Sequence, residues 1–447
     1  MTRRNFLSVG GAAVAGSTLA MNTGANALES RLVQTGGERI RGFKTLGRTG
    51  FQVSDLGVGG VPLRDSAVVR YAYEKGINYI DVAEGYGRGA AEDAVGEAMQ
   101  FMDRSKIFIT TKIRVGNNDT VETVIDRFNQ CMARMKTSYV DAFYMHGIPS
   151  VEALSTPVFH TATDQLKADG RIKFIGFSSH SPGRGSPDSI EDIIMAGATD
   201  GRFDVVLFTY NFMTSPEWAE KALKTLYENG VGVTGMKTSP GGLKPQPFDP
   251  DNLTESQSRA VERGVSSGRQ TREQAIERLQ GQLESQERTY QNTKPFIDKY
   301  GVQSQEQLRL ASIHWVAQNP LMSTACVGMN DLDIIDKIVP LSGRPLPSAD
   351  EAMLQDYKVV LNDKYCRHGC NECAGSCPQG LQVSTIMRYA YYFEHQGREK
   401  AAMEQYLALD DGTALNCIGC RAPCNGACPH GINVQATMLQ AHNLLTL

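Results

Sequence analysis

Cysteine is concentrated near the end of this 447-residue chain, where eight of its ten cysteines fall into two groups of four. The two groups are Cys366-x3-Cys370-x2-Cys373-x3-Cys377 and Cys417-x2-Cys420-x3-Cys424-x3-Cys428, and each ends directly before a proline. Four thiolates within one short loop can wrap a polynuclear iron–sulfur centre, and the proline ends the wrapping loop. The sequence therefore predicts two [4Fe–4S] clusters and a chain that carries electrons.

Disulfide bonds and zinc sites are the alternatives for the same cysteines. Disulfide scaffolds are typical of small secreted domains that lack a core, and this chain is long enough to build one. Zinc sites usually use Cys pairs on separate arms, often together with histidine. Two complete quartets fit both alternatives less well than they fit iron–sulfur clusters. The other two cysteines, Cys131 and Cys326, lie in apolar stretches and are expected to be buried packing residues.

The quartets resemble those of a dicluster ferredoxin domain, although each has one more residue in an internal gap than the bacterial motif C-x2-C-x2-C-x3-C-P. Between them, STIMRYAYYFEHQG and EKAAMEQYLALDDG read as helices, which favours the helical type of that domain. The resemblance implies that the last cysteine of each motif ligates the other cluster. One cluster would be held by Cys366, Cys370, Cys373 and Cys428, and the other by Cys417, Cys420, Cys424 and Cys377.

Short apolar runs alternate with amphipathic stretches from about residue 43 to about residue 343. In residues 120–135, for example, the apolar side chains fall on one face of a helix. Eight runs rich in Val, Ile and Phe are typical of strands buried on both faces. These are residues 53–60, 78–83, 106–113, 141–146, 172–178, 204–210, 231–237 and 324–329. Eight such units predict an α/β fold, a (β/α)8 TIM barrel, with a doubly wound sheet as the alternative.

Four side chains capable of acid–base chemistry follow three consecutive strands of this predicted barrel. Asp81 and Tyr86 follow the second strand, Lys112 ends the third and His146 ends the fourth. Catalytic residues of such barrels lie at the C-terminal ends of the strands, so we expect the four to gather at one mouth. A carbonyl that accepts a hydride needs a proton, which Tyr86 can supply if Lys112, oriented by Asp81, lowers its pKa. His146 would orient the substrate oxygen.

The segments FKTLGRTGFQVSDLGVGG, GINYIDVAEGYG, ITTK and YVDAFYMHG resemble motifs of the aldo/keto reductase family. The resemblance covers most of residues 43–343 and implies that the four residues above form a catalytic tetrad. It also implies a nicotinamide cofactor, NAD(P). The expected cofactor-binding residues are Ser178, Ser179, Met236 and Lys237. Ser178 would hold the carboxamide, and Lys237 would serve the pyrophosphate or be a solvated lysine.

Several positions of this cofactor site depart from the family pattern. Ser179 stands where the family often has Asn, Leu207 where Gln is common, and Met236 where an aromatic ring often stacks on the nicotinamide. Family members that bind a 2′-phosphate carry a basic residue near strand eight. Here the segment CVGMNDLDIID has no base before Lys337, which argues against selectivity for NADPH.

Nicotinamide transfers two electrons together, whereas an iron–sulfur cluster transfers one at a time. No G-x-G-x-x-G sequence stands in the context of a dinucleotide fingerprint, between a strand and the helix that follows it. Three explanations stay open at this point. A flavin could bind at the barrel mouth, the clusters could be structural or redox-sensing, or a redox partner protein could supply the missing step.

The first residues have the features of an export signal. TRRNFL at residues 2–7 is followed by an apolar stretch and by an A-x-A cleavage site at Ala25-Asn26-Ala27. The pair Arg3-Arg4 resembles a twin-arginine signal, which implies periplasmic export of the folded protein with its clusters. Cleavage after Ala27 would remove two arginines and change the net charge from −4 to −6, which argues against a nucleic-acid partner. No other segment is long and apolar enough for stable membrane insertion.

The expected domains are a signal peptide at 1–27, the barrel at 40–345 and the dicluster domain at 355–447. The linker is expected at 341–351. An insertion at about 244–300 starts with a Pro- and Asp-rich turn and continues as a polar helix. We interpret this helix as a solvated surface element, with a lid or a partner surface as the alternative.

Together these features predict an exported oxidoreductase that interconverts a carbonyl and an alcohol, with Tyr86 as general acid or base. The expected substrate is a sugar or another small polar carbonyl compound. One alternative is an electron-transfer or redox-sensing protein with a non-catalytic barrel. Another is an epimerase or lyase that recycles a bound nicotinamide within one catalytic cycle.

Overall fold

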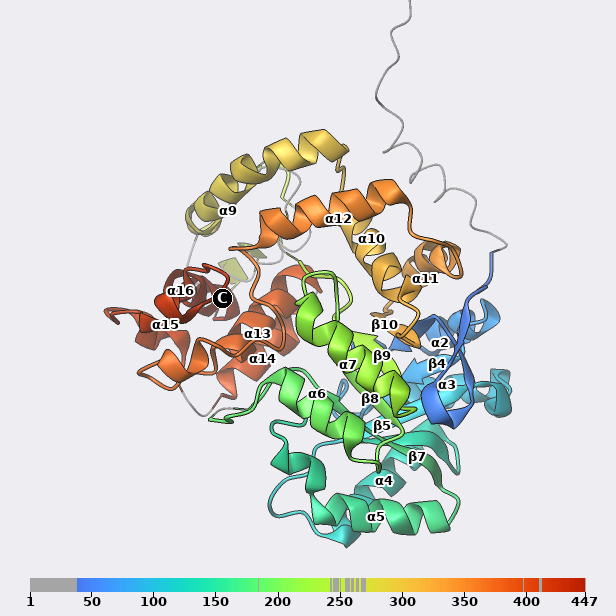
Figure 1. Ribbon diagram of the computed structural model, residues 1–447. Coiled ribbons are helices and arrows are strands. Elements are labelled where there is room, and N and C mark those ends of the chain that lie inside the picture. The colour runs from blue at the N-terminus through green and yellow to red at the C-terminus, as the bar shows by residue number, and fades with distance from the viewer. Residues whose placement is uncertain are drawn as a thin grey trace, which may run out of the picture.

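The computed structural model describes residues 38–446, apart from 184, 242, 244–248, 250, 254–257, 259–260, 263–264, 267–270, 397 and 410–411. In helix α9 it does not describe the side chains of residues 278–289. The expected signal peptide at 1–27 lies outside the described residues. Figure 1 shows a barrel of strands with one group of helices around it and a second group beside it.

Eight parallel strands close into a barrel in the order β10-β3-β4-β5-β6-β7-β8-β9. Their bounds are β3 Leu56–Gly59, β4 Tyr79–Asp81, β5 Phe108–Ile113, β6 Val140–Met145, β7 Ile172–Ser179, β8 Val205–Thr209, β9 Gly232–Met236 and β10 Thr324–Gly328. The barrel closes where Ala325 of β10 pairs with Leu56 of β3. The predicted (β/α)8 barrel is therefore confirmed. The doubly wound alternative is wrong, because such a sheet would leave its first and last strands as edges.

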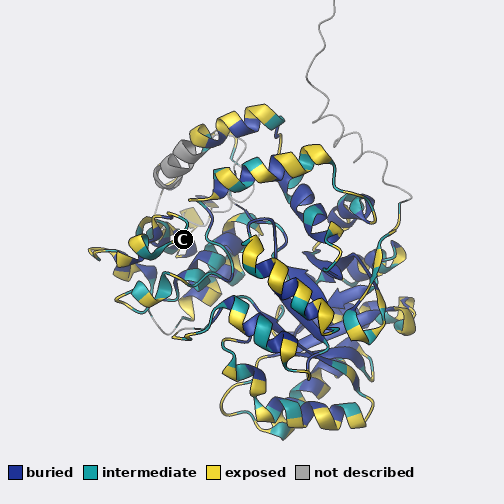
Figure 2. Ribbon diagram, viewed as in Figure 1, coloured by how far each residue is buried: buried dark blue, intermediate teal, exposed yellow. Residues whose placement is uncertain are grey.

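Helices cover the outside of the barrel. They are α2 Ser66–Glu74, α3 Ala90–Ala98, α4 Val121–Met135, α5 Pro157–Ala168, α6 Ile190–Thr199, α7 Pro216–Glu228, α10 Gln305–Gln318 and α11 Leu332–Ile338. In α4, Thr120 and Thr123 form a reciprocal capping box that satisfies free N–H groups of the first turn. Val124, Phe128 and Met132 of α4 are buried, as the helical periodicity predicts. Figure 2 shows the outer helices buried on one side and exposed on the other.

A two-stranded hairpin, β1 Phe43–Thr45 and β2 Gln52–Ser54, precedes the barrel. The predicted first strand at 53–60 is thus divided between this hairpin and β3. Leu46 and Val53 from the hairpin pack with the barrel-lining side chains Tyr79, Phe108 and Tyr144. Cys326 belongs to the same interior core, and Cys131 is buried in the outer core. Both cysteines are therefore the buried packing residues that the sequence predicts.

The insertion ends in a long helix, α9 Arg272–Tyr300, which packs against α12 Ser348–Leu361 (Figure 1). Three residues near its C-terminal end, Thr293, Phe296 and Ile297, are buried. The polar helix is therefore solvated on one face and anchored on the other. No helix in the described part of the chain is long and apolar enough to span a membrane.

All regular structure described beyond α12 is helical. It consists of α13 Val383–His395, α14 Glu399–Leu407, α15 Pro423–Ala427 and α16 Val434–Leu445, with the short 3-10 turns Ala374–Ser376 and Ala414–Cys417 in the cysteine-containing segments. Figure 1 shows this helical group, in orange to red, beside the barrel. Its core includes Tyr357, Ile386 and Tyr406 and continues into Phe212 and Leu243 from loops of the barrel. A shared apolar core of this kind holds the two parts together.

Candidate active site and cysteine loops

A buried ion pair lies at the C-terminal ends of β4 and β5. Lys112 Nζ donates hydrogen bonds to Asp81 Oδ1 and to the backbone oxygen of Val82, both at 2.6 Å. Thr110 Oγ1 donates to the same Asp81 oxygen at 2.8 Å. The Lys112 side chain is 0% exposed and that of Asp81 4%. A charge this deeply buried is tolerated only when it is paired and hydrogen-bonded, as this pair is.

Tyr86 and His146 lie beside this ion pair. Their ring centres are 5.7 Å apart and the rings are almost perpendicular, at 85°. Lys112 Nζ lies 5.0 Å from the centre of the Tyr86 ring. The structure therefore brings the four residues of the expected tetrad together at the C-terminal ends of β4, β5 and β6. Both residues are half-buried.

The ionisation of Tyr86 differs from the sequence-based expectation. Burial, and then the negative charge of Asp81, raise the pKa of Tyr86 well above its usual value. We expected Lys112 to lower this pKa, but Lys112 directs its hydrogen bonds to Asp81 and Val82. The phenol therefore stays protonated at neutral pH. Burial and the positive charges of Lys112 and Arg114 hold the pKa of His146 well below its usual value, so its imidazole is neutral.

The four residues that are expected to bind the nicotinamide cofactor lie in different surroundings. Ser178 Oγ accepts a hydrogen bond from Gly147 N at 3.0 Å, and Ser179 Oγ donates to the oxygen of Ile148 at 2.9 Å. Both serines are fully buried, and these bonds tie β7 to the loop after β6. Met236 belongs to the barrel-interior core. Of the four, Lys237 alone faces the helical group, with its Nζ 4.5 Å from the centre of the Tyr392 ring in α13.

The helical group lies over the barrel mouth. Tyr391 of α13 donates a hydrogen bond to the oxygen of Ser239 at 2.6 Å, just after β9. Arg388 of the same helix donates to Ser181 Oγ at 3.4 Å, just after β7. Sequence reasoning missed these contacts, because it assigned 384–397 only as a helix between two cysteine motifs. No local spacing could reveal them, since they join positions more than 150 residues apart.

The eight clustered cysteines form two groups of neighbours in space. After burial, the charges that raise the pKa of Cys366 are those of Cys370, Cys373 and Cys428. For Cys417 the corresponding neighbours are Cys377, Cys424 and Cys420. Helix α15 packs against the 3-10 turn Ala374–Ser376, which brings the two motifs into contact. The last cysteine of each motif thus lies near cysteines of the other motif. Cys424 also raises the pKa of Cys373, so the two groups adjoin each other.

The structure does not show a metal site among these thiols, all of which belong to the described part of the chain. Within the described residues, no group of three or more His, Cys, Asp or Glu side chains is close enough to hold one metal ion. A cluster of several irons separates its thiolates more widely than one ion does, because the irons and sulfides lie between them. The number of thiols in each set, four, equals the number of cysteine ligands that a [4Fe–4S] cluster takes.

The first cysteine loop also contacts the barrel. At Gly369, which has a φ of +93°, a Cβ atom would lie 3.2 Å from the backbone oxygen of His180 at the end of β7. Glycine at this position allows the loop between Cys366 and Cys370 to approach the barrel mouth closely. Of the two cysteine groups, the one that contains Cys366 and Cys370 is therefore held against the barrel.

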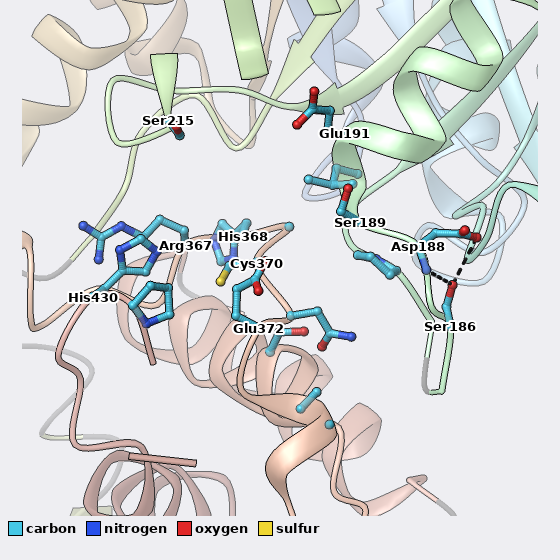
Figure 3. A pocket seen from close by; sticks show the side chains of 18 of the residues that line it. Ser186, Asp188, Ser189, Glu191, Ser215, Arg367, His368, Cys370, Glu372 and His430 are labelled. Atoms are coloured by element: carbon cyan, nitrogen blue, oxygen red, sulfur yellow. Dashed lines mark hydrogen bonds between the residues drawn. The ribbon is translucent and has the colours of Figure 1, made fainter. Parts of the chain in front are cut away.

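A cavity of about 1190 Å³ lies beside this contact, between the starts of α6 and α7 and the cysteine loops. Figure 3 shows Ser189, Glu191 and Ser215 from the barrel on one side and Arg367, His368 and Cys370 on the other. Because Cys370 lines this cavity, a molecule bound there would come close to the first cysteine group.

The fold and the site define a (β/α)8 barrel with an Asp–Lys pair, a Tyr and a His at its mouth. The profile of the aldo/keto reductase family matches residues 62–357, and the chain belongs to this family. The prediction of an oxidoreductase of this type is thereby confirmed. The matched region runs from the loop after β3 into α12, and the eight clustered cysteines lie beyond it.

Similar proteins include probable aldo-keto reductase 1 of Glycine max, which is 32% identical over 31% of this chain and 44% of that protein. L-galactose dehydrogenase of Arabidopsis thaliana is 28% identical over 53% of this chain and 79% of that protein. The match thus spans less than half of the soybean protein. A solved aldo-keto reductase of Bacillus halodurans is 19% identical, with a TM-score of 0.46, over 70% of this chain and 95% of that one.

Proposed function

We propose that this protein is an exported oxidoreductase that interconverts a carbonyl and an alcohol at the mouth of its barrel. The observation that carries the proposal is the buried Asp81–Lys112 pair beside Tyr86, with the neutral His146 across from it. A sugar or another small polar carbonyl compound is the proposed substrate, and a relative named L-galactose dehydrogenase supports that class. The export proposal rests on the twin-arginine pattern at residues 2–7.

Tyr86 and His146 have different roles at the substrate oxygen. Tyr86 holds a proton at neutral pH and donates it as negative charge develops on that oxygen. The neutral His146 donates an N–H to the same oxygen and orients it. Lys112 Nζ lies 5.0 Å from the centre of the Tyr86 ring, and the Asp81 carboxylate keeps the phenol protonated until the proton is donated.

The proposed cofactors are a nicotinamide at the barrel and two [4Fe–4S] clusters in the helical group. A bound nicotinamide would supply or accept the hydride, and the hydroxyl hydrogen of Ser178 is the group proposed to hold its carboxamide. A flavin at the same mouth is the alternative, because it could also exchange single electrons with the clusters. We assign the cluster ligands as Cys366, Cys370, Cys373 and Cys428 for one and Cys417, Cys420, Cys424 and Cys377 for the other. A redox partner would dock at the cavity lined by Cys370.

Replacing Tyr86 by phenylalanine is expected to lower turnover by about 10²- to 10⁴-fold, because the substrate oxygen then loses its proton donor. The measurement is the steady-state rate on a panel of aldoses and polyols, with protein purified anaerobically and with each candidate electron acceptor. The exposed Tyr227, changed to phenylalanine, serves as the matched control and should retain the full rate. The iron content should be the same in both variants. Full turnover in Tyr86→Phe would favour an electron-transfer or redox-sensing protein whose barrel is not catalytic.

A further inference from the structure

Lys237, which follows β9, has an unusual backbone conformation. Its φ is +57°, in the left-handed region that residues other than glycine rarely adopt. Asn211 holds it there, because Asn211 Nδ2 donates to the oxygen of Lys237 at 2.8 Å while its Oδ1 accepts from Met213 N at 2.9 Å. Strain that the surroundings maintain in this way is concentrated at functional sites. Here it directs the lysine towards Tyr392 of the helical group.

Positive charges surround the buried Tyr392. Lys237 Nζ lies 4.5 Å from the centre of its ring, and the Arg398 guanidinium carbon also lies 4.5 Å from it. Arg388, one turn earlier on α13, is held towards β7 by Ser181. Within the described residues, none of these three cations forms an ion pair with a carboxylate. They repel one another, and Arg398 and Arg388 both act to lower the pKa of Lys237.

Lys237 follows β9 and Arg388 bonds to Ser181 after β7, so these cations lie at the barrel mouth, where the proposed catalytic centre also lies. The hydroxyl of Tyr392 and the guanidinium of Arg398 both influence the pKa of Tyr86, and Lys237 influences that of His146. All three cations are half-buried, and gathering positive charges in partly desolvated surroundings without a negative partner is costly. An anion bound among them would relieve this cost, and it would be held next to Tyr86.

We propose that Lys237, Arg388 and Arg398 bind an anionic oxygen group of the substrate, so that the helical group forms one wall of the active site. This inference rests on the proposed function and narrows the class of substrate. The substrate is a carbonyl or alcohol compound that carries a carboxylate, as a sugar acid does, or a phosphate, as a sugar phosphate does. Arginine suits both groups, because its planar fork can donate two parallel hydrogen bonds to either of them.

Anion binding can be measured without turnover through the ionisation of Tyr392. Lys237, Arg388 and Arg398 lower the pKa of this phenol to about 8, although burial opposes them. Other titratable groups near this part of the mouth include Tyr86, Tyr389, Tyr391, Arg64, His180 and His368. A bound anion neutralises the cations and repels phenolate, so it should raise this pKa. Ultraviolet difference spectra of the holoprotein from pH 7 to 10 follow the transition, which the Tyr392→Phe variant should lack.

The probes are glucuronate, inorganic phosphate and glucitol, each titrated separately into the holoprotein. We expect glucuronate or phosphate to move the Tyr392 transition to higher pH and neutral glucitol to leave it unchanged. A shift with glucuronate alone identifies a carboxylate as the group, and a shift with phosphate alone identifies a phosphate. If neither anion moves the transition, the proposal is overturned. It is equally overturned if only a nicotinamide dinucleotide moves it, because the cations would then bind the cofactor.

Kinetics of arginine variants provide the second test. Arg388→Gln and Arg398→Gln should each raise KM for the anionic substrate by about 10- to 100-fold, because each variant loses one charge-assisted hydrogen bond. The change in kcat should be smaller. Arg70→Gln, at a half-exposed arginine on α2, is the matched control and should leave KM unchanged. Equal KM values in wild type and both variants would contradict the anion site. Tyr86→Phe separates the two proposals, because it should lower turnover by about 10²- to 10⁴-fold and keep the anion-induced shift of the Tyr392 pKa.

Discussion

Replacing Lys112 by methionine is expected to destabilise the protein by about 3–5 kcal/mol and to abolish turnover. The variant leaves the Asp81 carboxylate buried without its cation, and an unpaired buried charge carries a penalty of this size. In the wild type, Lys112 Nζ is 2.6 Å from Asp81 Oδ1 and fully buried. Urea unfolding followed by circular dichroism measures the loss of stability, and the steady-state rate measures the loss of activity. Lys294→Met, which breaks an exposed pair with Asp298 on α9, should leave both unchanged.

The double variant Asp81→Asn, Lys112→Met separates the structural role of the pair from its catalytic role. Removing both charges eliminates the unpaired carboxylate, so much of the lost stability should return. Turnover should not return, because the two charges beside Tyr86 that set the electrostatics of its proton transfer are both gone. If the refolded double variant regains activity, the pair is structural only. If Lys112→Met unfolds at the same urea concentration as the wild type, the buried pair does not stabilise the barrel as its geometry indicates.

Removing one cluster ligand is expected to remove one whole cluster. Which cluster is lost should depend on which cysteines lie together in space, and not on which sequence motif contains the replaced cysteine. Cys366→Ala and Cys428→Ala should lose the same cluster, although 62 residues separate the two positions, because their thiols belong to one group. Cys377→Ala should lose the other cluster with Cys417→Ala, although Cys377 belongs to the first motif. Iron should fall from about eight to about four per chain in each variant, since each [4Fe–4S] cluster holds four irons.

Electron paramagnetic resonance of the reduced variants identifies which cluster remains. The spectra of Cys366→Ala and Cys428→Ala should be alike, and they should differ from those of Cys377→Ala and Cys417→Ala. Cys131→Ala is the matched control, because Cys131 is buried between α4 and the barrel and should not affect the iron content. If Cys377→Ala instead resembles Cys366→Ala, each motif holds its own cluster. If the wild-type protein contains no iron, the cluster proposal is wrong, and the eight cysteines bind zinc or form disulfide bonds instead.

The barrel could be predicted because its signals are local. Each strand is a short run of apolar residues, and all eight expected runs became strands of one barrel. The positions of Asp81, Lys112 and His146 at strand ends also followed from the sequence, since parallel strands bring their C-terminal ends to one edge. Local pattern was less reliable at the first run, because residues 53–60 contain the end of hairpin strand β2 and all of β3, with only Asp55 between the two strands.

The ionisation of Tyr86 could not be predicted in the same way. Residue types alone pointed to a lysine that lowers the pKa of a tyrosine, whereas the structure directs that lysine to Asp81 and Val82 and buries the phenol. A pKa depends on burial and on distances of a few ångströms between groups far apart in sequence. The same reason applies to Ser178 and Ser179, whose hydroxyl bonds to the loop after β6 could not be read from their motif.

The sequence by itself determined the (β/α)8 barrel, the four acid–base residues at its strand ends and the two cysteine quartets, because periodicity and spacing are local properties. Only the tertiary structure decided that α13 lies over the barrel mouth and that Lys237, Arg388 and Arg398 surround Tyr392. These contacts depend on how two apolar surfaces pack, and the core that joins Phe212 and Leu243 to Tyr357 draws on segments more than 100 residues apart. Packing between distant segments produces no periodic pattern in the sequence. The wall that the helical group adds to the active site therefore could not be predicted from the sequence.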